Sequence, residues 1–87
     1  MRIIGQIFHL LLMSVKNGQE ILAKNIRKYR KLQGLTMVQL SVIIYPDGDF
    51  YSHLSRIELG KINIKVDTIF LIADALKIDA YLLLKED

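Results

Sequence analysis

The fold is decided by the stretch Ser52-His53-Leu54-Ser55-Arg56-Ile57-Glu58-Leu59-Gly60-Lys61. One set of side chains recurs at the i, i+3, i+4, i+7 spacing of a helix face: Phe50, His53, Leu54 and Ile57. A second, mostly polar set falls on another face: Tyr51, Ser52, Ser55 and Arg56. The pattern predicts a short helix that is anchored by its first face and free to contact a ligand with its second. A helix of about ten residues has about the right size to enter the major groove of DNA.

Two further helices are predicted before this stretch. Leu22, Ile26 and Tyr29 recur at helical spacing, and Gly34 stands where a left-handed cap is usual. Thr36-Met37-Val38-Gln39 has the form of a capping box, which predicts a helix that runs to about Ile44. The turn at 45–49 (Tyr-Pro-Asp-Gly-Asp) ends it, so that Asp49 or Phe50 opens the next helix and Gly60 closes it.

The C-terminal part predicts two more helices. An apolar stripe defines the fourth helix: Val66, Ile69, Ile72, Ala73 and Leu76. A break near Lys77-Ile78 and a cap at Asp79 lead into a fifth helix over 81–84. No strand pattern stands out in residues 17–87, so we expect an all-α, five-helix domain over 17–87, preceded by an apolar N-terminal extension over 1–16.

Composition narrows the function classes. At 87 residues and 52% hydrophobic the chain fits one domain with a sufficient core. The absence of cysteine excludes disulfides and thiolate metal sites and fits a reducing cytoplasm, where we expect the protein. His9 and His53 make no ligand pattern, and no phosphate loop or nucleophile–base pair is visible. We therefore expect that the protein binds no metal and no cofactor and that it is not an enzyme.

Charge is unevenly distributed along the chain, whose net charge is +3. The segment from Lys16 to Gly34 holds six basic residues against Glu20 alone: Lys16, Lys24, Arg27, Lys28, Arg30 and Lys31. Acidic residues outnumber basic ones from Val66 onward: Asp67, Asp74, Asp79, Glu86 and Asp87 against Lys77 and Lys85. The chain therefore has one basic end and one acidic end.

Residues 3–13 form an apolar run behind Arg2. The run is too short to span a bilayer and no small-residue cleavage site follows, so we expect neither a membrane anchor nor export. Two interpretations stay open. Met13 is the natural start, and the first twelve residues are an upstream extension; or the run packs on the domain or on a second copy. If the run belongs to the folded protein, we favour a dimer contact.

The predicted helix pair around the 45–49 turn resembles the helix-turn-helix of the lambda-repressor/Cro-type family of bacterial regulators. The resemblance extends from about Leu22 to Leu84. These pieces carry it: Asn25 to Lys31, Gly34-Leu35-Thr36, Leu40-Ser41, Leu54 to Lys61, Asp67-Thr68-Ile69 and Ile72 to Leu76. Three departures stand out. The segment between Leu40 and Glu58 is three residues longer than usual; Met37 stands where a glutamine is common; and Ile64, Lys65 and Lys77 replace the usual proline, cap and glycine.

The resemblance implies roles for individual residues. In this family the first helix of the pair lies across the phosphate backbone and the second reads base edges. Base contacts fall on Tyr51, Ser52, Ser55 and Arg56, of which Arg56 suits guanine O6 and N7. Backbone contacts fall on Thr36, Met37, Phe50, Lys61 and Asn63. Arg30 and Glu58 correspond to an ion pair that locks two helices together.

The implied function is sequence-specific transcriptional regulation by a homodimer on a palindromic operator, since one short helix reads too few bases. Dimer contacts are expected at Ile78, Tyr81 and Leu82. A short chain of this kind suits a restriction-modification controller, a phage or plasmid repressor, or an antitoxin. The alternative is a protein-interaction module that uses the same fold, such as an antitoxin whose main partner is a toxin.

Overall fold

The computed structural model describes residues 18–86, and every regular element in that range is a helix. Helix 18–32 comes first, followed by α2 (Met37–Ile44), α3 (Tyr51–Glu58), α4 (Val66–Ala75) and α5 (Tyr81–Leu84). The all-α, five-helix fold expected from the sequence is therefore confirmed over these residues. The expectations for the N-terminal extension, 1–16, lie outside the described residues.

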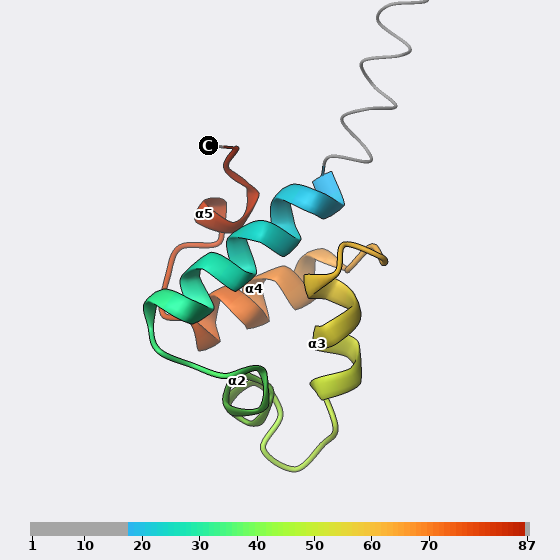
Figure 1. Ribbon diagram of the computed structural model, residues 1–87, viewed down its shortest axis with the longest axis vertical. Helices are drawn as coiled ribbons and strands as arrows, with labels where there is room; N and C mark the ends of the chain where they lie inside the picture. The colour runs from blue at the N-terminus through green and yellow to red at the C-terminus, as the bar shows by residue number, and fades with distance from the viewer. Residues whose placement is uncertain (1–17, 87) are drawn as a thin grey trace, which may run out of the picture.

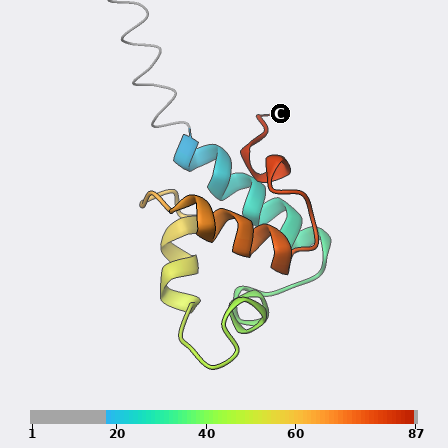
Figure 2. The same cartoon turned by 180° about the vertical axis from the view of Figure 1, so that it is seen from behind.

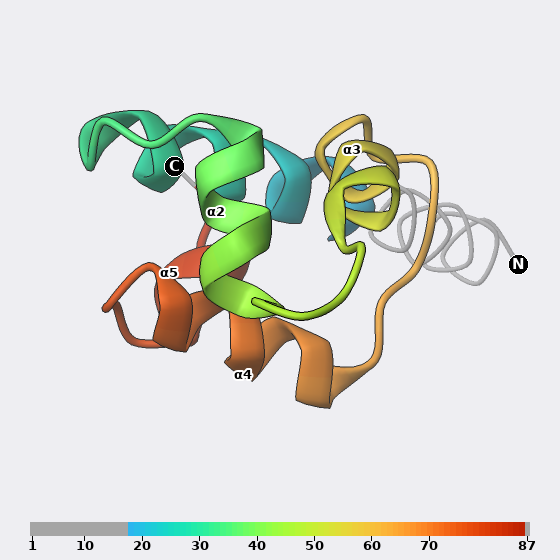
Figure 3. The same ribbon diagram turned by 90° about the horizontal axis from the view of Figure 1, so that it is seen from below.

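The helices enclose a core between two layers. Helix 18–32 crosses in front of α4 in Figure 1, and α4 lies in front of it when the molecule is seen from behind in Figure 2. In Figure 3, α2 lies in the plane of the picture while α3 is seen end-on, so the two helices cross steeply. α2 packs against both α3 and α4. This arrangement leaves one side of α3 turned outward.

Each helix contributes to a single apolar core. The largest side chains that are fully buried come from all five helices: Ile26, Leu40, Leu54, Ile57, Ile72, Leu76 and Leu83. Burying a side chain of this size contributes about 1.5–3 kcal/mol. The periodicity that predicted the helices therefore also identified most of the side chains that hold them together.

The helix ends follow local chemistry. The Thr36 hydroxyl accepts a hydrogen bond from the Gln39 backbone N–H at 3.1 Å, and the Gln39 side chain accepts one from the Thr36 N–H at 2.9 Å, which completes the predicted capping box. Gly34 and Gly60 have φ of +69° and +68°, a conformation that favours glycine and ends helix 18–32 and α3. Phe50 is the N-cap of α3, and the Asp49 carboxylate before it accepts a hydrogen bond from the Tyr51 N–H at 3.2 Å.

Three details differ from the sequence expectations. The side chain of His53 is exposed, although its ring meets Phe50 edge-on at 5.1 Å. Val66 is 65% exposed because the first residue of α4 projects beyond the core that Ile72 and Leu76 reach. The predicted cap at Asp79 is wrong: Ala80 is the N-cap of α5, and no side chain caps it.

Long-range polar contacts hold the C-terminal part in place. The Asn25 amide is buried and donates to the carbonyl oxygens of Leu83 at 2.9 Å and Lys85 at 2.8 Å. The Gln33 side chain donates to the carbonyl oxygen of Leu76, at the end of α4. Because α5 is only four residues long, the Leu83 and Lys85 carbonyls have few partners of their own, and Asn25 of helix 18–32 supplies one.

Residues 18–86 contain neither a membrane-spanning helix nor a metal-binding cluster. None of the helices there combines the length and the apolar content that a membrane crossing requires. Nor do three or more His, Asp or Glu side chains converge anywhere in 18–86 as metal ligands would.

Candidate nucleic-acid interface

The outer face of α3 is polar and accessible. Ser52 and Arg56 are exposed, Tyr51 is 42% exposed and Ser55 is half-buried. The opposite face carries Leu54 and Ile57 into the core, so the helix cannot rotate without exposing them. The four predicted base-contacting residues thus lie on the accessible side of one anchored helix.

An ion pair fixes the end of α3 to helix 18–32. Arg30 donates from Nε to Glu58 Oε2 at 2.8 Å and from Nη2 to Glu58 Oε1 at 2.9 Å. Its remaining nitrogen, Nη1, donates to the Leu35 carbonyl oxygen at 2.9 Å. The two side chains are only 12% and 4% exposed. The pair expected from the sequence is therefore present, and it also holds the loop that enters α2.

A groove lies where helix 18–32, the start of α2 and the end of α3 meet. Arg27, Met37, Ser55 and Leu59 line it beside the ion pair. Arg27 is exposed on this wall and was not among the predicted site residues. Its spacing of three residues from Arg30, which places both on one helix face, is the sequence signal that could have identified it.

The start of α2 offers backbone donors to the same side. The capping box occupies the N–H groups of Thr36 and Gln39, whereas the N–H groups of Met37 and Val38 have no acceptor within the helix. No acidic residue lies in the first turn of α2. An anion approaching this end would meet two N–H groups and the positive end of the helix dipole.

The predicted backbone contacts differ in accessibility. Lys61 is exposed just beyond α3, and Asn63 is exposed with its side-chain oxygen accepting a hydrogen bond from Gln19. Phe50 belongs to the core, and its side chain is only 8% exposed. The expected backbone contact at Phe50 stays a prediction, for which little of the packed ring is accessible.

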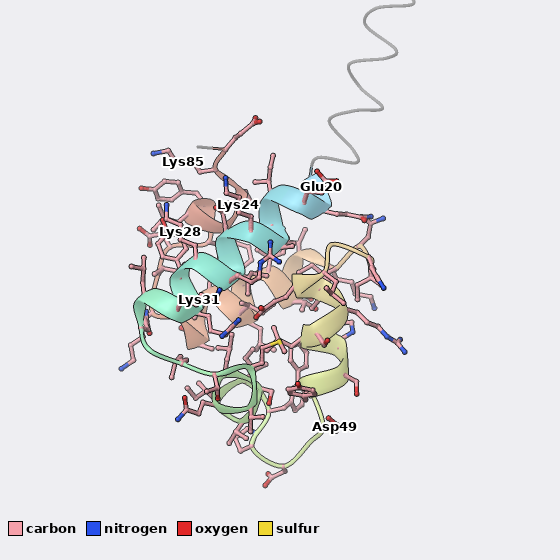
Figure 4. The ribbon with its side chains drawn as sticks, in the orientation of Figure 1. Glu20, Lys24, Lys28, Lys31, Asp49 and Lys85 are labelled. Carbon is pink, nitrogen blue, oxygen red and sulfur yellow. The ribbon has the colours of Figure 1, made fainter. Side chains whose placement is uncertain are left out.

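The enlarged turn folds against the start of α3. The rings of Tyr45 and Phe50 stack with centroids 6.0 Å apart, and the Asp49 carboxylate is held by the Tyr51 N–H. Figure 4 shows Asp49 beside the first turn of α3, and Lys24, Lys28 and Lys31 following one another along helix 18–32. The turn therefore brings a negative charge close to the outer face of α3.

The expected dimer contacts lie away from α3. Tyr81 is 62% exposed, while Ile78 and Leu82 are half-buried. α5, which carries two of them, lies beside helix 18–32 and apart from α3 in Figure 1. A second copy placed there would leave the outer face of α3 open.

Several apolar side chains on α2 and α4 are exposed, which the sequence did not predict. Val38, Val42 and Ile43 on α2 are 49–58% exposed, and Phe70 and Leu71 on α4 are 60% and 42% exposed. A helix that only crosses phosphates has no need of such side chains. On α2 the exposed Val38, Val42 and Ile43 have the spacing of core residues. Nothing in the local sequence distinguishes them from Leu40 and Ile44, which are buried.

No protein-family model, curated protein or solved structure matches the chain.

Proposed function

We propose that this protein is a sequence-specific, DNA-binding transcriptional regulator that acts as a homodimer on a palindromic operator. The observation that carries the proposal is the polar outer face of α3, which is anchored from behind by Leu54, Ile57 and the Arg30–Glu58 pair. Met37, in the first turn of α2, lines one groove together with Ser55 of α3. α2 and α3 would serve as the helix-turn-helix of a lambda-repressor-like fold.

In this proposal α3 enters the major groove. Arg56, exposed in its last turn, donates two hydrogen bonds to guanine O6 and N7, while Tyr51, Ser52 and Ser55 contact neighbouring bases. Phosphates are held by the α2 N-terminus next to Thr36 and Met37, and by Arg27, Lys61 and Asn63. The phosphate contacts set the register, and the bases confer the specificity.

A dimer would supply the missing selectivity. Two recognition helices one turn of DNA apart, about 34–36 Å, read two half-sites. Together they distinguish an operator from the many non-specific sites in a genome. Tyr81, with Ile78 and Leu82 beside it, is the proposed contact. A cytoplasmic restriction-modification controller, a phage or plasmid repressor and an antitoxin are the regulators that suit such a chain.

The second candidate function is a protein-interaction module, with a toxin as one kind of partner. The exposed apolar side chains of α2 and α4 favour it, since Ile43 and Leu71 line one pocket between these helices and exposed apolar patches mark protein contacts. An antitoxin would combine both functions.

The test measures binding of the full chain to two duplexes, the DNA upstream of its own gene and a scrambled sequence. Each is measured at about 0.1 M and about 0.2 M salt. A specific regulator should prefer its operator by about a thousandfold or more at both salt concentrations. Arg56→Ala should erode this preference, whereas Lys85→Ala, an exposed change at the C-terminus, should leave it. The proposal would be overturned if the protein bound both duplexes equally and the higher salt abolished this binding. That result would favour the protein-interaction module.

A further inference from the structure

A second groove opens at the N-terminal end of helix 18–32 and shares only Asn63 with the candidate interface. Its lining is almost wholly apolar: Leu22, Ile62, Ile64, Ile69 and Leu84, with Gly18 at one end. The three isoleucines are only partly buried and Leu84 is 55% exposed. The groove therefore joins four parts of the chain and leaves apolar surface uncovered.

The groove contains no charged side chain. Its two polar lining residues, Gln19 and Asn63, are hydrogen-bonded to each other. A charged ligand would thus find no counter-charge in the groove. An apolar segment is therefore the kind of ligand that suits this groove.

We propose that the apolar run at residues 3–13 of the same chain docks on this groove and places apolar side chains in it. The run supplies the matching side chains: Ile3, Ile4, Ile7, Phe8, Leu10, Leu11, Leu12 and Met13. Gly18 is itself part of the groove, and the residues at 14–17 can span about 13 Å, so the run is tethered within reach.

The tether decides between the same chain and a second copy. A short flexible linker gives a tethered segment an effective concentration in the millimolar range, far above that of a second copy at micromolar protein. Occupation of the groove covers Ile62 and Ile64, and so it also braces the 61–65 segment that carries Lys61 and Asn63. The proposal does not depend on DNA binding and stands or falls separately from it.

The experiment uses a nitroxide spin label on the full chain, which is simplified by the absence of native cysteine. Lys65→Cys places the label on an exposed residue next to Ile64. Asp47→Cys, at the exposed enlarged turn, is the control position. The observable is the paramagnetic weakening of the backbone amide signals of residues 3–13 by NMR.

The expected result is strong weakening across residues 3–13 from the label at position 65 and little from the label at position 47. Leu84→Asp should reduce this weakening several-fold, whereas Leu32→Asp, a matched change at a leucine 70% exposed outside the groove, should not. Both leucines are exposed, so both variants should keep the fold.

Three results would overturn the proposal. One is weakening that falls steadily from residue 17 toward residue 3 and ignores Leu84→Asp, as a free tether would give. Another is no weakening beyond the control. The third is weakening only between an isotope-labelled chain and a separate spin-labelled chain, which would assign the groove to a second copy.

Discussion

Arg30 and Glu58 meet in a two-point ion pair that joins helix 18–32 to the end of α3, with N–O distances of 2.8 and 2.9 Å. The third guanidinium nitrogen holds the Leu35 carbonyl oxygen, in the loop before α2. One side chain thus sets the relation between three elements. The orientation of α3, on which the proposed DNA contact depends, is fixed by a polar contact as well as by the core.

Removal of one partner should be costly. Glu58→Gln leaves the Arg30 charge nearly buried without its counter-charge, and should lower the free energy of unfolding by about 3 kcal/mol in urea titrations. Glu20→Gln, at an exposed position on helix 18–32, is the control and should change it by under about 0.5 kcal/mol. The double variant Arg30→Met with Glu58→Leu should recover most of the loss. Equal stability of Glu58→Gln and Glu20→Gln would show that the pair is unimportant.

Asn25 should stabilise α5 from a distance. Asn25→Ala removes both hydrogen bonds to the Leu83 and Lys85 carbonyl oxygens and should cost about 1–3 kcal/mol. Hydrogen exchange should accelerate most at the amides of 81–85, because their anchor to helix 18–32 is lost. Lys24→Ala, the exposed neighbour, should leave exchange there unchanged. Uniform acceleration over the whole domain would contradict a local anchor.

Lys77 is the one residue other than glycine with positive φ within 18–86, at 58°. Because a left-handed conformation costs a residue with a Cβ about 1 kcal/mol, Lys77→Gly should raise the melting temperature by stabilising the protein by about that amount. Lys65→Gly is the matched control: Lys65 has φ −70°, and the change should destabilise by about 0.5 kcal/mol. A loss of stability in Lys77→Gly would show that the lysine side chain makes a needed contact.

Two exposed basic residues should affect DNA binding in different ways if the proposed function holds. Lys61→Ala should weaken binding to operator and scrambled DNA alike and reduce the slope of log affinity against log salt by about 1. Arg56→Ala should instead cost about 1–3 kcal/mol on the operator and relax preference at one base pair. Equal losses on both duplexes for the Arg56 variant would exclude its role at a base edge.

Local pattern was enough to predict the helices and several of their ends. The apolar spacing of Leu54 and Ile57 identifies the buried face of α3, and the capping box at Thr36 forms as its four residues indicate. Gly34 and Gly60 mark helix ends because only a residue without Cβ adopts φ near +70° at little cost. These features involve residues within a few positions of one another, so sequence alone determines them.

Contacts between distant residues were decided only by the tertiary structure. Arg27 reaches a groove wall completed by Met37 and Ser55, and Asn25 finds carbonyls 58 and 60 residues further along the chain. Phe50 enters the core while the equally apolar Val42 stays exposed. Periodicity gives the direction of a side chain from its own helix, but which surface covers it depends on how the helices pack. Burial and access at the candidate interface therefore follow from the packing of all five helices together.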